Sequence, residues 1–187
     1  MKIPLLPTVL VFSLAACASA EAEDSPASRL SLKGLQGIAV RVDPVAASAQ
    51  KDGLSAAAIR TAVESRLRKG AIRVLTAEQQ RQTAQRACLA VHVATSKLGT
   101  GEHLYAIHVE VSQWVASLAD PTLTVSAAIP IPATTWTAAS VFGITTGEQL
   151  ERDALGAVGK MAEQFIGAYH KANPSETAFR FRAGGVR

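Results

Sequence analysis

Residues 88–118 decide the fold, and they read CLAVHVATSKLGTGEHLYAIHVEVSQWVASL. Two long apolar-rich runs, 88–98 and 104–118, are separated by the sequence GTGE, which is typical of a hairpin turn. In the second run, apolar and polar side chains alternate with a period of two, as in a strand that has one packed face and one wet face. The segment therefore predicts a long antiparallel hairpin with one face on a core.

Shorter elements precede the hairpin. Residues 37–42 and 72–75 are rich in β-branched side chains and predict strands, and the Ala/Ser-rich residues 45–53 between them predict a loop. Residues 54–69 repeat apolar side chains at three- and four-residue spacing and predict a helix. Residues 76–86 predict a short surface helix, which Thr76 and Gln79 begin as a capping box.

The chain after the hairpin predicts further strands and a long last helix. A strand over 123–131 has to end, bulge or lie at an edge at its prolines, and residues 134–145 predict one more short strand. Thr146 and Gln149 predict a capping box for the last helix, which ends at Asn173-Pro174. Its apolar stripe consists of Leu150, Ala154, Ala157, Met161, Phe165 and Ala168.

This order of elements predicts the α+β class. We expect a two-layer sandwich, with a mixed, mostly antiparallel sheet of four to five strands and two main helices on one face. Residues 34–174 form this single domain, residues 21–33 a flexible leader and residues 175–187 a flexible basic tail. The outer face of such a sheet is free to meet water or a partner.

The amino-terminal residues resemble a secretory signal peptide: Lys2, a short apolar core, small residues and then an acidic stretch. The apolar core, about 14 residues, is shorter than the roughly 20 that span a bilayer. Two cleavage sites overlap. Cleavage after the Ala-Ser-Ala of residues 18–20 makes 1–20 the signal peptide of a soluble periplasmic protein, whereas the lipobox-like LAAC of residues 14–17 makes it 1–16 and anchors Cys17 in a membrane through lipid.

Charge and cysteine content limit the function further. The formal net charge of +4 falls to +3 when the signal peptide with Lys2 is removed, and it is too weak and dispersed to predict a nucleic-acid partner. Cys17 and Cys88 are the two cysteines, so the mature chain has no intramolecular disulfide. Cys88 lies in an apolar run and is expected to be a buried, inert thiol.

The wet face of the hairpin carries the candidate site. If the hairpin pivots on Thr100, His92 lies opposite His108, and a slip of two residues puts it opposite Glu110. Two imidazoles and a carboxylate at that spacing can reach one metal ion, but ordinary polar residues on a wet face are the favoured interpretation of this pattern. Trp114 falls on the same face and is either the apolar centre of a contact surface or covered by another part of the chain.

The second half of the chain resembles a group of uncharacterised bacterial exported proteins. The segments that carry this resemblance are YAIHVEVSQ at 105–113, ATTW at 133–136 and FIGAYHKANP at 165–174. It implies a shared fold and no known activity. The order of elements also resembles envelope proteins such as the lipopolysaccharide-assembly lipoprotein LptE and the amino-terminal domain of TolB, which are non-enzymatic partners of larger machines.

We therefore expect a non-catalytic envelope protein, periplasmic or anchored in the outer membrane, that binds another envelope protein or an envelope component. No nucleophile elbow, P-loop or dinucleotide fingerprint is present in the sequence, and no cofactor is expected. The alternative is a small hydrolase or metal-dependent enzyme that uses His92, His108 and Glu110, or Cys88.

The overlap of the two cleavage sites gives the first prediction. If the lipid reading holds, Cys17→Ser abolishes acylation and releases the protein from membranes, because the thioether to the lipid cannot form. Mass spectrometry of the mature amino terminus checks this directly. A mature chain that begins at Glu21 would rule the lipid reading out.

Overall fold

The structure is a computed structural model, and it describes residues 24–116 and 130–174. Several sequence predictions lie outside these residues: the signal peptide 1–20 or 1–16, Cys17, the basic tail 175–187 and most of the strand predicted over 123–131. None of the described helices combines the length and the apolar character that crossing a membrane requires.

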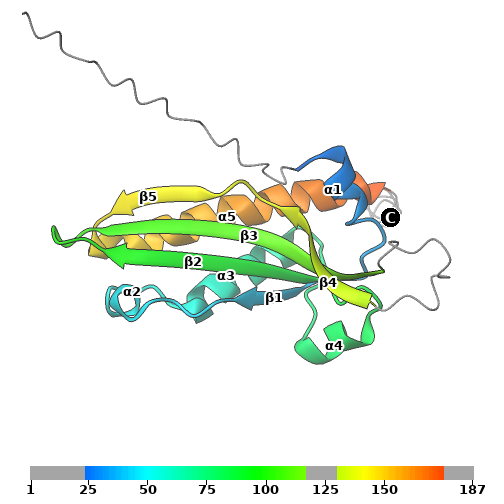
Figure 1. The fold of residues 1–187 in the computed structure, drawn as a ribbon, viewed down its shortest axis with the longest axis horizontal. Coiled ribbons are helices and arrows are strands. Elements are labelled where there is room, and N and C mark those ends of the chain that lie inside the picture. Colours follow the sequence, from blue (N-terminus) through cyan, green and yellow to red (C-terminus); the bar gives the residue numbers. More distant parts are fainter. Residues whose placement is uncertain (1–23, 117–129, 175–187) are drawn as a thin grey trace, which may run out of the picture.

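The β-strands form one mixed, five-stranded sheet, as the sequence predicted (Figure 1). β1 (Ala39–Val42) pairs in parallel with β2 (Cys88–Lys97), and β2 pairs antiparallel with β3 (His103–Ala116). The long β3 then holds two strands along its other edge, β4 (Pro130–Thr137) at one end and β5 (Val141–Thr145) at the other. The register shifts between β3 and β4, where Val111 pairs with Trp136 and Ser112 with Thr134.

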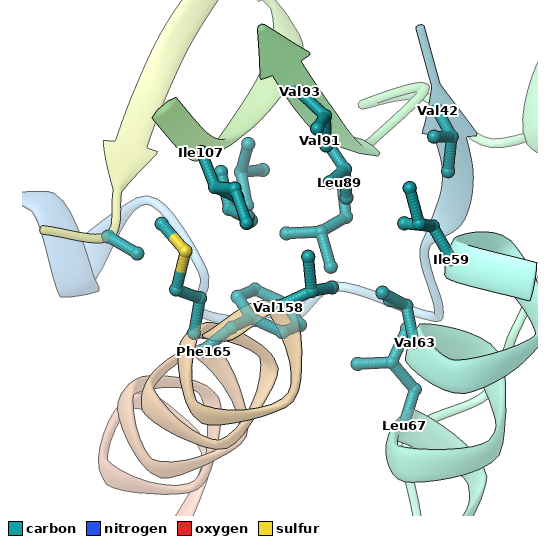
Figure 2. Packing of buried hydrophobic residues seen from close by; sticks show 14 of the residues in the cluster. Val42, Ile59, Val63, Leu67, Leu89, Val91, Val93, Ile107, Val158 and Phe165 are labelled. Atoms are coloured by element: carbon teal, nitrogen blue, oxygen red, sulfur yellow. The ribbon is translucent and has the colours of Figure 1, made fainter. Parts of the chain in front are cut away.

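Two main helices, α3 (Ala56–Lys69) and α5 (Gly147–Ala172), lie on one face of this sheet (Figure 1). The predicted α+β sandwich is therefore confirmed. Figure 2 shows the inward side chains of the hairpin meeting Ile59, Val63 and Leu67 of α3 and Val158 and Phe165 of α5. The apolar stripe predicted for the last helix is buried along its length, and its members are Leu150, Ala154, Ala157, Met161, Phe165 and Ala168.

Three short helices complete the described chain. α4 (Ala77–Gln82) has the predicted capping box between Thr76 and Gln79. α2 (Ala47–Lys51) lies where the sequence predicted only loop, because its Ala/Ser-rich residues tolerate a helical turn and Ala49 is fully buried. α1 (Pro26–Leu30) begins with a capping box of its own and lies next to α5 (Figure 1).

Three local predictions need correction. The leader predicted as flexible over 21–33 includes α1, and Leu32 after it is fully buried in the core. The strand predicted over 72–75 reduces to a single parallel bridge between Ile38 and Val74. Thr146 is the N-cap residue of α5, but its side chain makes no capping hydrogen bond, and the N–H of Gln149 donates instead to the Thr146 carbonyl, 3.1 Å away.

Asp52, which follows α2, fixes the turn end of the hairpin. Its Oδ2 lies 2.9 Å from Lys97 Nζ and 2.7 Å from Nε2 of the fully buried His103. The hydrogen bond from Lys97, followed by that from His103, holds the pKa of the Asp52 carboxyl below its ordinary value of 3.8. Both strands of the hairpin are thereby tied to α2.

Phe165 gives the stability prediction of this fold. Its ring is fully buried and lies edge-on to Trp136, with centroids 5.4 Å apart. Phe165→Ala should lower the free energy of unfolding by about 3–5 kcal/mol, because it removes a buried ring and leaves a cavity. Denaturant unfolding of both proteins measures the difference. An unchanged melting temperature would mean that α5 does not pack on the sheet as described.

Candidate functional site

The candidate site is the outward face of the β2–β3 hairpin, opposite the helices. His92 and His108 pair directly across the two strands, which is the register that a pivot at Thr100 predicted. Their rings are stacked, with centroids 5.9 Å apart and an interplanar angle of 30°. The two side chains are 34% and 39% exposed, because both point away from the core on the outer face of the sheet.

Glu110 lies between the two imidazoles. Its Oε1 is 3.6 Å from Nε2 of His92 and its Oε2 is 3.6 Å from Nε2 of His108. Thr134 of β4 donates a hydrogen bond of 3.1 Å to the same Oε2. The structure thus brings together His92, His108 and Glu110, and adds a hydroxyl that holds the carboxylate in place.

Two further residues, Asp43 and Ser140, extend this group in both directions. Asp43 Oδ2 lies 2.7 Å from His92 Nδ1, and Ser140 Oγ lies 3.2 Å from His108 Nδ1. We call the resulting line across the sheet the polar row; its members are Asp43, His92, Glu110, His108 and Ser140. Asp43 and Ser140 were not predicted as members of the site. In the sequence, Asp43 is part of a turn, and it reaches His92 only because β1 pairs beside β2.

The polar row is an arrangement of hydrogen bonds and close polar contacts. Every nitrogen of His92 and His108 faces an oxygen of a neighbouring side chain. Within residues 24–116 and 130–174, no group of three or more His, Cys, Asp or Glu side chains is placed to hold a metal ion. These contacts therefore support a role of the neighbouring oxygens in orienting the two imidazole rings more directly than they support metal coordination.

Cys88 begins β2 and is buried, as the sequence predicted. Burial raises the pKa of its thiol above the ordinary value of 9.0, and the nearby charge of Arg41 opposes this effect more weakly. Since the thiolate is the nucleophilic form, a raised pKa keeps Cys88 in its unreactive form near neutral pH.

The two tryptophans have different environments. Trp136 is fully buried in the core, whereas Trp114 is 37% exposed on the same face as His108 and Glu110. The guanidinium carbon of Arg86 lies 4.2 Å from the centroid of the Trp114 ring. Trp114 also forms part of the wall of a cleft of about 780 Å³ beside α4, and neither histidine of the polar row lines this cleft.

An apolar patch at the other end of the outer face was not predicted. Leu104 of β3 pairs with Ile144 of β5, and the next outward pair is Ala106 with Phe142. Phe142 is 72% exposed and Ile144 is 61% exposed. Phe142 and Ile144 are two residues apart, so a strand over residues 141–145 places both on one face, and this spacing could have predicted the patch. We call Leu104, Phe142 and Ile144 the β5 patch.

Comparison with known proteins finds no matching family model and no matching curated protein. Among solved structures, this chain is similar to a PelC dodecamer from Paraburkholderia phytofirmans, with 19% sequence identity and a TM-score of 0.39. The match covers 67% of this chain and 85% of the PelC chain. It is also similar to a minor lipoprotein from Acinetobacter baumannii, with 12% sequence identity and a TM-score of 0.33. That match covers 73% of this chain and 92% of the lipoprotein chain. Overlaps at this level do not place the chain in a family.

Cys88 provides a test of the cysteine-enzyme alternative. The buried thiol of the native mature protein should react with a thiol reagent much more slowly than the same thiol in denaturant, because it is both shielded and protonated. Cys88→Ala should keep the fold at a cost of about 1 kcal/mol. Rapid stoichiometric labelling of the native protein would contradict the inert reading of this residue.

Proposed function

We propose that this protein is a non-catalytic binding protein of the bacterial envelope, and that it contacts another envelope protein through the outer face of its sheet. The observation that carries the proposal is the β5 patch, which leaves three large apolar side chains in water at the end of β3. Contiguous exposed apolar side chains on a folded protein mark an interaction surface. The envelope location rests on the signal peptide predicted over residues 1–20 or 1–16.

The pairing of β5 supports this proposal. Among the strands of the described chain, β5 pairs only with β3, so its other edge has no strand partner there. An open edge with apolar side chains invites pairing with other chains, and native proteins cover or charge such edges. Phe142 and Ile144 carry no charge, so a partner that covers β5 removes both the apolar surface and the free edge from water.

The absence of a role in catalysis is part of the proposal, and the state of Cys88 supports it. The polar row itself does not decide the point, because Ser140 Oγ lies 3.2 Å from His108 Nδ1 and Glu110 lies 3.6 Å from the other nitrogen of the same ring. Cys88 has a raised pKa and is buried. In this proposal the polar row gives the docking face fixed polar contacts beside the apolar patch.

Substitutions in the β5 patch test the proposal. Phe142→Ser and Ile144→Ser should each reduce capture of the partner from envelope extracts by about tenfold or more, because truncating a central apolar anchor removes most of its binding energy. Leu30→Ser is the matched control, since Leu30 is 70% exposed on α1, away from the sheet face. Crosslinking from a photoreactive residue at position 142, followed by mass spectrometry, identifies what is captured.

Equal capture by the wild-type protein and both β5 variants would overturn the docking proposal, as would equal losses in the Leu30 control. A crosslink to a second copy of the same chain would replace the envelope partner by self-association. Turnover that disappears in His92→Ala, His108→Ala or Glu110→Gln would overturn the non-catalytic part.

A further inference from the structure

A second surface lies at the opposite end of β3, in the cleft of about 780 Å³ beside α4. β2 begins at Cys88, which pairs with Ser112, whereas β3 continues to Ala116. Beyond that point, the N–H of Trp114 donates to the Gln85 carbonyl, 2.7 Å away, in place of a β2 residue. The cleft lies beside this part of β3 that extends beyond β2, between α4, the edge of β1 and the end of the sheet.

Arginine is concentrated in the wall of this cleft. Of the residues that the structure describes, five of the nine arginines line it, whereas none of the six lysines does. These arginines are Arg41, Arg60, Arg68, Arg81 and Arg86. Among the described lining residues there is a single carboxylate, that of Glu64. A guanidinium presents a planar fork of donors that matches carboxylate and phosphate groups, which a lysine ammonium does not.

Two of these arginines are not engaged by acidic side chains. Three of the five form ion pairs with carboxylates of the chain, and they are Arg41, Arg68 and Arg81. Arg60 and Arg86 form no ion pair with a carboxylate in the described part of the chain. On α3, Arg60 lies four residues before Glu64 and eight residues before Arg68. Side chains at this spacing project from one side of a helix.

The backbone of Arg86 is held in an unusual conformation. Arg86 has a φ of 46°, in the left-handed region that a non-glycine residue rarely adopts. Two contacts fix it there: Gln80 Nε2 donates to the Arg86 carbonyl at 2.9 Å, and the Arg86 N–H donates to Thr83 Oγ1 at 3.2 Å. The guanidinium then lies over Trp114. Stacking on an aromatic ring orders a guanidinium and leaves its N–H edge for a ligand.

We infer that this cleft binds a small oligoanion, a ligand with two or more phosphate or carboxylate groups. Arg60 and Arg86 supply the unengaged guanidinium groups, whereas the charges of the other three arginines are balanced by their carboxylate partners. The volume suits a ligand larger than a single inorganic anion, since small-molecule sites occupy about 300–1,000 Å³. Trp114 supplies a flat apolar wall on the same side as Arg86. This inference does not depend on the docking face proposed above.

Calorimetric titration of the full mature chain with tripolyphosphate and, separately, with citrate tests the inference. We expect saturable one-to-one binding of at least one probe, weaker at higher salt. Arg60→Gln and Arg86→Gln should each raise the dissociation constant by about tenfold, because each removes a charge-assisted contact. Arg86→Lys should also weaken binding, since lysine keeps the charge but loses the fork and the stacking.

Arg152→Gln is the matched control. It lowers the net charge by the same amount, but Arg152 is an exposed residue of α5 that does not line the cleft. Binding of tripolyphosphate alone would assign a phosphate ligand, and binding of citrate alone a carboxylate ligand. No saturable binding of either probe, or equal losses in Arg60→Gln and Arg152→Gln, would overturn the inference. Thermal melts of each variant verify folding, and Arg60→Gln carries the test if an Arg86 variant does not fold.

Discussion

The structure depends on the register between β2 and β3. Because strand side chains alternate between faces, the pairing of His92 with His108 sends Leu89, Val91 and Ile107 to the same inner side. α3 and α5 cover that side (Figure 2). A slip of one residue would bury the histidines and expose the valines, so the core fixes the register and, with it, every contact on the outer face.

The same constraint explains why the polar row is ordered although it is partly exposed. His92 lies on β2 and Glu110 and His108 lie on β3, whereas Asp43 directly follows β1 and Ser140 lies in the short segment that joins β4 to β5. Backbone pairing places the three strand residues, and the N–H of Asp43 donates to the Val91 carbonyl of β2, 3.1 Å away. His92 is held on both sides, by Asp43 at one nitrogen and Glu110 at the other. Such a row defines the orientation of polar groups on the face before any partner arrives.

The sequence predicts the parts of this fold that rest on local periodicity. A period of two and a short turn predict the hairpin and the side chains that share a face, although they leave open whether His92 lies opposite His108 or Glu110. The buried stripe of α5 follows from a period of 3.6. Tertiary contacts decide the rest: Asp43 reaches His92 only through the parallel pairing of β1, and Thr146 has the residue type of a capping box without forming one. The arginines of the cleft come from three separated segments, which are β1, α3 and residues 81–86, so their sequence positions look dispersed although the fold gathers them.

The two surfaces share one strand but not their side chains. Leu104 at the β5 patch and Trp114 at the cleft are ten residues apart on β3, which corresponds to about 34 Å along the strand. At that separation, with no common partner, substitutions at the two ends are expected to add independently. β3 is also the strand that pairs with three others, and its inner side chains form the middle of the core. A central strand that extends beyond β2 at one end and pairs with the short, apolar β5 at the other end thus places both surfaces.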